Sequence, residues 1–197
     1  MTYTYGVTLI TGPRCRRKRM LATSLNSICG GSVAHIHVGE MLGRHFQHQT
    51  PIGRRLKRVA GDEMRHYREQ PMELVLEAVQ DWITKALEHQ NAEHIVLSGS
   101  PSSEPEAMIW EKLITNLCVV NVKTTREHVA KEISVYPNGY ADLEAAAEMV
   151  WTEYETEILP AFAQVRCAKI LVNQDDPVLV NVQQIVRAMH LEKSHKQ

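Results

Sequence analysis

The chain contains 197 residues, of which 44% are hydrophobic and 23% are charged. This length suits a single domain with a full hydrophobic core, and the composition excludes collagen-like, disordered and disulfide-stabilised chains. The 22 basic and 23 acidic residues give a net charge of −1, which argues against a bulk nucleic-acid binder. Local basic patches stay open as binding surfaces.

The cysteines and the first residues indicate the compartment. Cys15, Cys29, Cys118 and Cys167 are too far apart in sequence to form a CxxC pair, so we expect no zinc site. Scattered single cysteines fit a reducing compartment. The first apolar run is too short to cross a membrane and lacks the charged lead and long apolar stretch of a signal peptide. We therefore expect a cytoplasmic protein that does not contact a membrane.

Short apolar runs predict five strands, and each is followed by a segment with helical periodicity. The strands are expected at residues 5–10, 33–37, 94–99, 117–122 and 169–173. The helices are expected at residues 16–29, 39–49, 52–67, 72–89, 103–113, 125–134, 141–165 and 177–189. This alternation is typical of a parallel sheet covered by helices on both faces, so we expect one α/β domain over residues 1–197.

Ser103 and Glu106 have the spacing of a capping box, in which two side chains satisfy the free backbone N–H groups at a helix start. We therefore expect a helix to begin at Ser103.

The segment after the first strand holds an altered phosphate-binding loop. A working P-loop follows the pattern G-x-x-x-x-G-K-[ST], in which the glycines let backbone N–H groups approach the phosphates. Its lysine reaches the β- and γ-phosphates, and its hydroxyl holds Mg²⁺. Gly12 and Lys18 keep this spacing, whereas Arg17 replaces the second glycine. Arg19 and Met20 stand where the hydroxyl is expected.

Four segments in order resemble the motifs of the adenylate kinase family, which are G-x-P-G-x-G-K-G-T, H-I-S-T-G-D-M-L-R, D-G-F-P-R and Y-x-x-x-x-x-P-L. The matching segments here are residues 12–20, residues 35–42, residues 98–102, and the pair Tyr154 and Pro160. The similarity spans nearly the whole chain. It implies a P-loop NTPase-like, three-layer α/β/α fold with a five-stranded parallel sheet.

The resemblance also implies a site. It places a nucleotide-monophosphate-binding arm at residues 38–70 and a short or missing lid at residues 134–141. Lys18 is the catalytic candidate, with ATP and Mg²⁺ as the implied cofactors. The acceptor-site candidates are Gly39, Glu40 and Arg44, where Glu40 matches the family's aspartate and Arg44 adjoins the position of its arginine.

The departures from the family's motifs fall on catalytic positions. Ser98 matches the aspartate that helps to organise Mg²⁺, and Ser102 matches the arginine that grips the acceptor phosphate. The short lid segment carries no arginine. Phosphoryl transfer depends on positioning and on neutralising spread charge, and one lost preorganised group costs roughly 10²-fold or more. We therefore expect catalysis to be impaired.

Five of six consecutive positions in the first loop are basic, which suggests a phosphate grip made of side chains. Together with Gly12, the phosphate-binding candidates are Arg14, Arg16, Arg17, Lys18 and Arg19. Arginine forks bind phosphate well, and a helix N-terminus favours anions. A solvated basic turn is an equally good interpretation, because bulky residues resist the backbone angles of a tight phosphate loop.

A second basic run, at residues 54–58, surrounds an apolar helical stripe and is expected to be a solvated outer face. If this arm faces the first loop, the two runs would form one basic cleft. His35 and His37 share one strand face, but no carboxylate or cysteine completes a metal-ligand set, so we expect no metal site.

Three functions remain open. The first is a degenerate nucleotide-kinase-like protein that acts as a phosphate-ligand-binding or assembly subunit. The second is an active nucleoside or nucleotide kinase that transfers the ATP γ-phosphoryl group with an arginine-rich loop. The third is a ligand-free scaffold of a larger complex. A nucleotide, another phosphate-rich ligand, a nucleic acid and a protein are the partners that these hypotheses allow.

Overall fold

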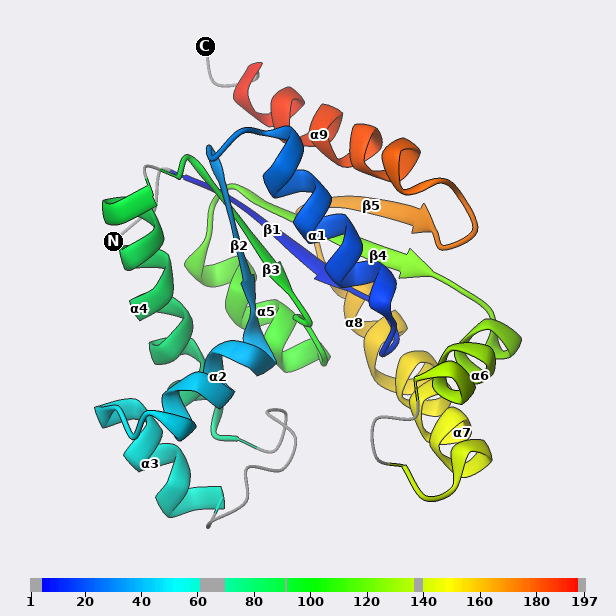
Figure 1. Cartoon of the computed structure of the whole chain (residues 1–197). Helices are drawn as coiled ribbons and strands as arrows, with labels where there is room; N and C mark the ends of the chain where they lie inside the picture. The colour runs from blue at the N-terminus through cyan, green and yellow to red at the C-terminus, as the bar shows by residue number, and fades with distance from the viewer. Residues whose placement is uncertain (1–4, 61–69, 91, 137–139, 195–197) are drawn as a thin grey trace.

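Five parallel strands form the centre of the computed structural model, which describes residues 5–60, 70–90, 92–136 and 140–194 (Figure 1). They are β1 (Gly6–Thr11), β2 (Val33–His37), β3 (His94–Ser98), β4 (Leu117–Lys123) and β5 (Ala168–Asn173). Their order in the sheet is β2-β3-β1-β4-β5. Every pair is parallel, with Val7 opposite Ile95 on one side of β1 and Leu117 on the other. The five predicted strands are confirmed.

Helices connect the strands. They are α1 (Arg16–Ile28), α2 (Val38–Gln47), α3 (Pro51–Ala60), α4 (Met72–Gln90), α5 (Glu104–Leu113), α6 (Arg126–Val135), α7 (Leu143–Glu153), the π-helical turn η2 (Tyr154–Ile158), α8 (Leu159–Gln164) and α9 (Val178–Ser194). These agree with the predicted helices in place and order. The predicted end of the third helix lies outside the described residues.

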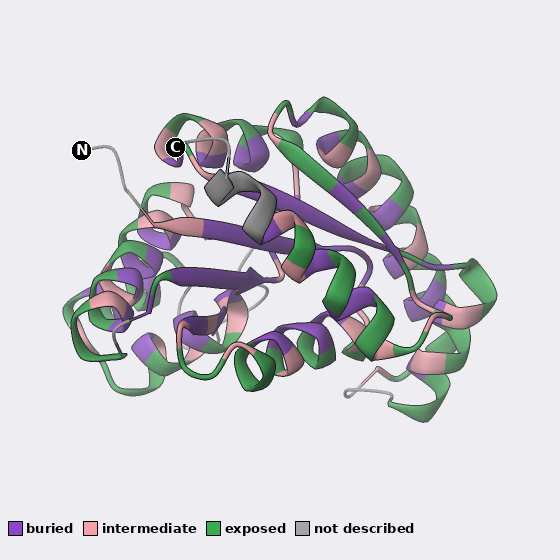
Figure 2. Cartoon of the chain, turned by 90° about the horizontal axis from the view of Figure 1, so that it is seen from above, coloured by how far each residue is buried: buried purple, intermediate pink, exposed green. Residues whose placement is uncertain are grey.

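The sheet lies between two layers of helices, as the sequence predicts. On one face, α1 and α9 pack against Ile10, Val96 and Val120 in an apolar cluster. On the other face, α4, α5 and α8 pack against strand residues that include Leu9 and Leu97. Strands β1 to β4 are accordingly mostly buried, whereas the edge strand β5 is largely exposed, as Figure 2 shows. The fold is therefore a three-layer α/β/α sandwich, and burial from both sides explains the nearly continuous apolar strand sequences.

Two local predictions need correction. The helix expected at residues 141–165 is interrupted by η2, so that α7 and α8 meet at a π-helical turn. The capping box at Ser103 does not form, although α5 begins directly after Ser103. The Ser103 side chain makes no capping hydrogen bond, and the Glu106 carboxylate binds Ser100 and Ser102 instead. The fold of the loop brings Ser100 and Ser102 close to Glu106, and these residues take the place of the Ser103 backbone N–H that a capping box would use.

Candidate functional site

The carboxyl ends of all five strands meet at one edge of the sheet, because every strand runs in the same direction. In open parallel sheets this edge is where ligands bind. The first loop, residues 12–15, leaves this edge from β1 and leads into α1. It lies between the arm formed by α2 and α3 and the hairpin formed by α6 and α7 (Figure 1).

The first loop is short. α1 begins at Arg16, two residues before Lys18, with Cys15 at the N-cap position. The loop turns at Gly12, whose φ is +133° and whose Cβ, if present, would lie 3.1 Å from the carbonyl oxygen of Val122. Glycine is therefore required there, because a side chain would be strained by both the backbone angle and the contact. The second glycine of a phosphate loop has no equivalent turn here, since Arg17 is already helical.

Lys18 points back into this loop. Its Nζ donates hydrogen bonds of 2.7 Å to the carbonyl oxygen of Gly12 and 2.6 Å to that of Pro13. The side chain is buried. The Nζ of this lysine, the catalytic candidate, therefore lies against the loop that follows β1 and stabilises that loop.

The other four basic side chains, of Arg14 in the first loop and of Arg16, Arg17 and Arg19 in α1, have different partners. Arg14 donates to the Tyr140 hydroxyl at 3.0 Å and lies 3.5 Å from the Glu153 carboxylate. Arg17 donates to the backbone carbonyl of Asp176, in the turn between β5 and α9. The predicted grip is thus divided, because each cation contacts a different part of the protein.

The remaining two cations contact different neighbours of α1. The Arg16 guanidinium stacks over the Tyr136 ring, with 4.3 Å from its central carbon to the ring centroid. Arg19 forms a 2.8 Å ion pair with Glu40. Both arginine side chains are exposed, so these contacts are weak and a ligand can compete for them.

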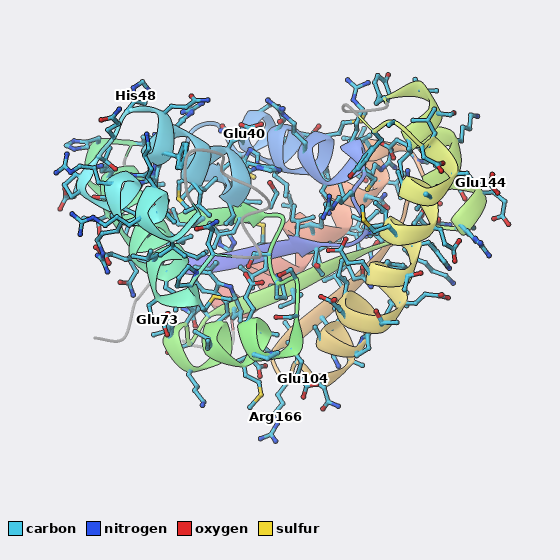
Figure 3. The ribbon with its side chains drawn as sticks, turned by 90° about the horizontal axis from the view of Figure 1, so that it is seen from below. Glu40, His48, Glu73, Glu104, Glu144 and Arg166 are labelled. Carbon is cyan, nitrogen blue, oxygen red and sulfur yellow. The ribbon has the colours of Figure 1, made fainter. Side chains whose placement is uncertain are left out.

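The acceptor-site candidates separate. Gly39 and Glu40 lie in the first turn of α2, and the Arg19–Glu40 ion pair joins that turn to α1. Figure 3 shows Glu40 at the inner end of the arm and His48 at its outer end. Arg44 instead lies over the Trp82 ring of α4, at 5.7 Å from the centroid. Glu40 therefore remains beside the first loop, whereas Arg44 packs along the arm.

The second basic run does not extend the first loop. α3 packs against α2 and α4. Arg54 donates to the carbonyl oxygen of Gln49, and Arg55 pairs with Glu77 on α4. This arrangement agrees with the expected outer face.

Two histidines at the end of β2 form a polar group with Ser98 and Glu40. The His35 Nε2 and the Ser98 Oγ are 2.8 Å apart, and the His37 Nδ1 caps α2 by accepting from the Glu40 N–H. Burial, and to a smaller extent the charges of His37 and Arg19, lowers the pKa of His35 to about 4. Burial also lowers the pKa of His37. Both imidazoles are therefore neutral at pH 7.

The loop after β3 is held by a buried carboxylate that the sequence analysis did not single out as a site residue. Glu106 is 1% exposed and accepts from the Ser100 hydroxyl at 2.5 Å and from the Ser102 hydroxyl at 2.7 Å. It also accepts from the Ser102 N–H at 2.6 Å, while the Trp110 indole donates to the Ser100 Oγ. Thr11 donates to the Pro101 carbonyl oxygen. These bonds fix the loop beside the first loop.

A half-open cavity of about 290 Å³ lies beside the start of α1. It is bounded by α1, by α6 and by the turn after β5. Its lining residues are Arg16, Arg17, Met20, His128, Lys131, Glu132, Val135, Tyr136 and Gln174. The cavity combines basic groups with the exposed apolar surface of Met20, Val135 and Tyr136. Such a lining suits a small ligand that has an anionic group and a flat, partly apolar body.

The segment 134–141, expected to be a vestigial lid, is described only in part because residues 137–139 lie outside the described ranges. Its described residues lie beside the first loop, where Tyr136 contacts Arg16 and Tyr140 contacts Arg14. Arg126 pairs with Glu148 at the exposed surface of α6 and α7. Lys131 lines the cavity.

Mg²⁺ finds a poor fit among the described residues. Arg19 and Met20 stand where a phosphate loop has its hydroxyl and offer no oxygen, and Ser98 is fully buried and bonded to His35. Within the described ranges, no three histidine, cysteine or carboxylate side chains converge as a metal site. None of the described helices is both long enough and apolar enough to span a bilayer.

No protein-family model matches the chain, and no curated protein matches it. Among solved structures, a gluconokinase from Sinorhizobium meliloti 1021 is similar over 97% of this chain and 95% of that chain, with a TM-score of 0.58 and 12% sequence identity.

This similarity shows a shared fold. The chain therefore has the same three-layer α/β/α architecture as that structure along nearly its whole length, in agreement with the predicted fold class.

Proposed function

We propose that the protein binds a nucleotide, or a related phosphate ligand, between the first loop and the cavity beside α1, and that it is impaired in phosphoryl transfer. The observation that carries this proposal is the cavity at the start of α1, which has Arg16 and Arg17 on one wall and Tyr136 on another. The protein would act as a degenerate relative of the adenylate kinases, in a binding or assembly role.

Charge and shape support a nucleotide. Arg16, Arg17 and Lys131 surround the cavity with positive charge, which attracts phosphate groups. The Tyr136 ring and the Met20 side chain offer apolar surface for a base. The buried Nε of Arg17 has no hydrogen-bond partner in the described structure, so a ligand oxygen would satisfy a donor that otherwise costs stability.

The arrangement of the same residues argues that catalysis is impaired. Lys18 is turned toward Gly12 and Pro13, and the cations that would surround a transferring phosphoryl group are tied to separate partners. ATP fits the basic lining of the cavity, whereas Mg²⁺ meets neither a hydroxyl at positions 19 and 20 nor a carboxylate at position 98. We therefore infer that the ligand binds with little help from Mg²⁺.

The experiment is a calorimetric titration of the protein with ATP. Arg16→Ala, Arg17→Ala and the double variant should weaken binding by roughly 10- to 100-fold for each cation removed, since charge-assisted hydrogen bonds contribute about 1.5–3 kcal/mol. Lys112→Ala, an exposed lysine on α5, serves as the matched control and should bind as the unmodified protein does. Equal affinity for ATP in all variants would show that the ligand does not bind in this cavity.

A further inference from the structure

The start of α1 already holds an anionic group of the protein itself. The Oε1 of Glu132, on α6, accepts a hydrogen bond of 2.5 Å from the backbone N–H of Arg16. Its Oε2 accepts from the Gln174 side-chain amide at 3.3 Å. Arg16 is the first residue of α1, so its N–H has no partner within the helix. Glu132 thus uses a donor that a bound anion would need.

A carboxylate and a phosphate compete for such a donor, because both are anions and the positive end of the helix favours either. Glu132 also lines the cavity, where its negative charge opposes that of Arg16 and Arg17. Two buried polar atoms at the cavity, the Nε of Arg17 and the Oε1 of Gln174, have no hydrogen-bond partner in the described structure. Glu132 therefore binds only some of the polar groups that line the cavity, and these two atoms are left for a ligand.

The contacts between α6 and the rest of the site are polar. α6 packs chiefly against α7, through an apolar cluster of its own that includes Val129, Ile133 and Val150. It reaches α1 through Glu132 and the Tyr136 ring, and the turn after β5 through Glu132 and through His128, whose Nδ1 lies 3.2 Å from Asp175. Breaking the Glu132 contacts would leave the apolar packing of α6 intact, so the carboxylate can leave at small cost.

We propose that Glu132 is an internal competitor of the phosphate ligand, which must displace this carboxylate from the Arg16 N–H in order to bind. The inference rests on the proposed function, because it concerns the same cavity. A ligand with several negative charges, such as a triphosphate, displaces a single carboxylate better than inorganic phosphate does. Glu132 thereby sets a preference for polyphosphate ligands and keeps α6 fixed to α1 while the site is empty.

The test compares Glu132→Gln and Glu132→Ala with Glu144→Gln, an exposed carboxylate at the start of α7 (Figure 3). Glu132→Gln keeps a hydrogen-bond acceptor but removes the charge, whereas Glu132→Ala removes both. Calorimetric titration with ATP and with inorganic tripolyphosphate should show about 10-fold tighter binding in both Glu132 variants. Glu144→Gln should leave the affinity unchanged. Among the ligands, inorganic phosphate should show the largest increase in affinity in Glu132→Ala.

A second measurement reads the contact itself. In the protein without ligand, the NMR signal of the Arg16 amide should shift upfield in Glu132→Ala, because a short hydrogen bond to a carboxylate is lost. Addition of tripolyphosphate to the unmodified protein should move the Gln174 side-chain amide signal toward its position in Glu132→Ala. An unmoved Gln174 signal at saturating ligand would mean that Glu132 is not displaced.

These outcomes distinguish the role of Glu132 from the binding function. If the unmodified protein binds ATP and the Glu132 variants bind equally or more weakly, Glu132 does not compete with the ligand and the binding function stands. If only the Glu132 variants bind, the competition is supported. If none of the variants binds either ligand, the binding function and the competition both fail.

Discussion

The Nζ of Lys18 donates a 2.7 Å hydrogen bond to the carbonyl oxygen of Gly12, at the opposite end of the first loop. A lysine at this spacing from the glycine is expected to reach phosphate oxygens. Here it binds backbone oxygens at both Gly12 and Pro13, and it is buried. Lys18 therefore has a structural role that persists without any ligand.

Replacement of Lys18 by methionine should destabilise the protein. The methionine fills a similar volume but leaves the carbonyl oxygens of Gly12 and Pro13 without their donor, which costs about 1–3 kcal/mol. The free energy of unfolding, measured in urea, gives the effect directly. Lys112→Met provides the comparison at an exposed position and should change it by less than about 0.5 kcal/mol. A Lys18 variant as stable as the unmodified protein would contradict the structural role.

Glu106 should be the most sensitive polar residue near the site. Glu106→Ala leaves the hydroxyls of Ser100 and Ser102 and the Ser102 N–H buried without an acceptor, at an expected cost of about 2–4 kcal/mol. Glu106→Gln keeps one oxygen acceptor and should lose less stability. Urea unfolding should therefore show a lower free energy of unfolding for the alanine variant than for the glutamine variant. The reverse order would show that the acceptor at position 106 does not stabilise the loop.

Gly53 should tolerate no side chain. A Cβ at this position would lie 1.8 Å from the carbonyl oxygen of His45, where α3 crosses the end of α2. Gly53→Ala should therefore cost more than about 3 kcal/mol, because backbone must move apart. Gly30→Ala is the matched control, since its Cβ meets nothing within 4 Å and only its φ of +59° opposes alanine. The free energy of unfolding of Gly30→Ala should be lower than that of the unmodified protein by about 1 kcal/mol. Similar melting temperatures for the two variants would contradict the close helix crossing.

Stability should fall below neutral pH. The unfolded chain protonates His35 near its ordinary pKa of 6.5, whereas the folded protein resists protonation until about pH 4. Protons therefore bind the unfolded state preferentially between these values, and the stability contribution present above pH 6.5 is lost as the pH falls. This group accounts for about 2–3 kcal/mol between pH 7.5 and 4.5.

The variant His35→Gln isolates this effect. Its free energy of unfolding should depend less on pH by about that amount, whereas His89→Gln, at an exposed position on α4, should keep the full dependence. Urea unfolding at the two pH values measures the difference. The same pH dependence in His35→Gln and the unmodified protein would rule out His35 as its source.

The strands were predictable because their apolar, β-branched runs are buried on both faces, as at Val119 and Val120 in β4. The order of the motifs predicted the α/β/α fold, which structural similarity confirms. The π-helical turn between α7 and α8 was not predictable, because the helical periodicity continues through it.

The position of the first loop between β1 and α1 was predictable, whereas its side-chain contacts were not. Gly12 and Lys18 marked the first loop, yet the directions of its arginines depend on partners far along the chain, such as Glu153 and Asp176. Glu132 was missed altogether. The spacing of His128 and Glu132 puts both on one face of α6, and Tyr136 follows at the end of that helix; this pattern was the available signal.

We propose that the protein binds a nucleotide without transferring its phosphoryl group. The most direct test is calorimetric titration of the unmodified protein with ATP, once with Mg²⁺ and once with EDTA, combined with a coupled assay for ADP release. We expect binding with similar affinity in both conditions and no turnover above background with nucleotide acceptors. Binding that requires Mg²⁺, together with ADP release, would show an active kinase and contradict this account. If ATP binds in neither condition, the ligand is not this nucleotide.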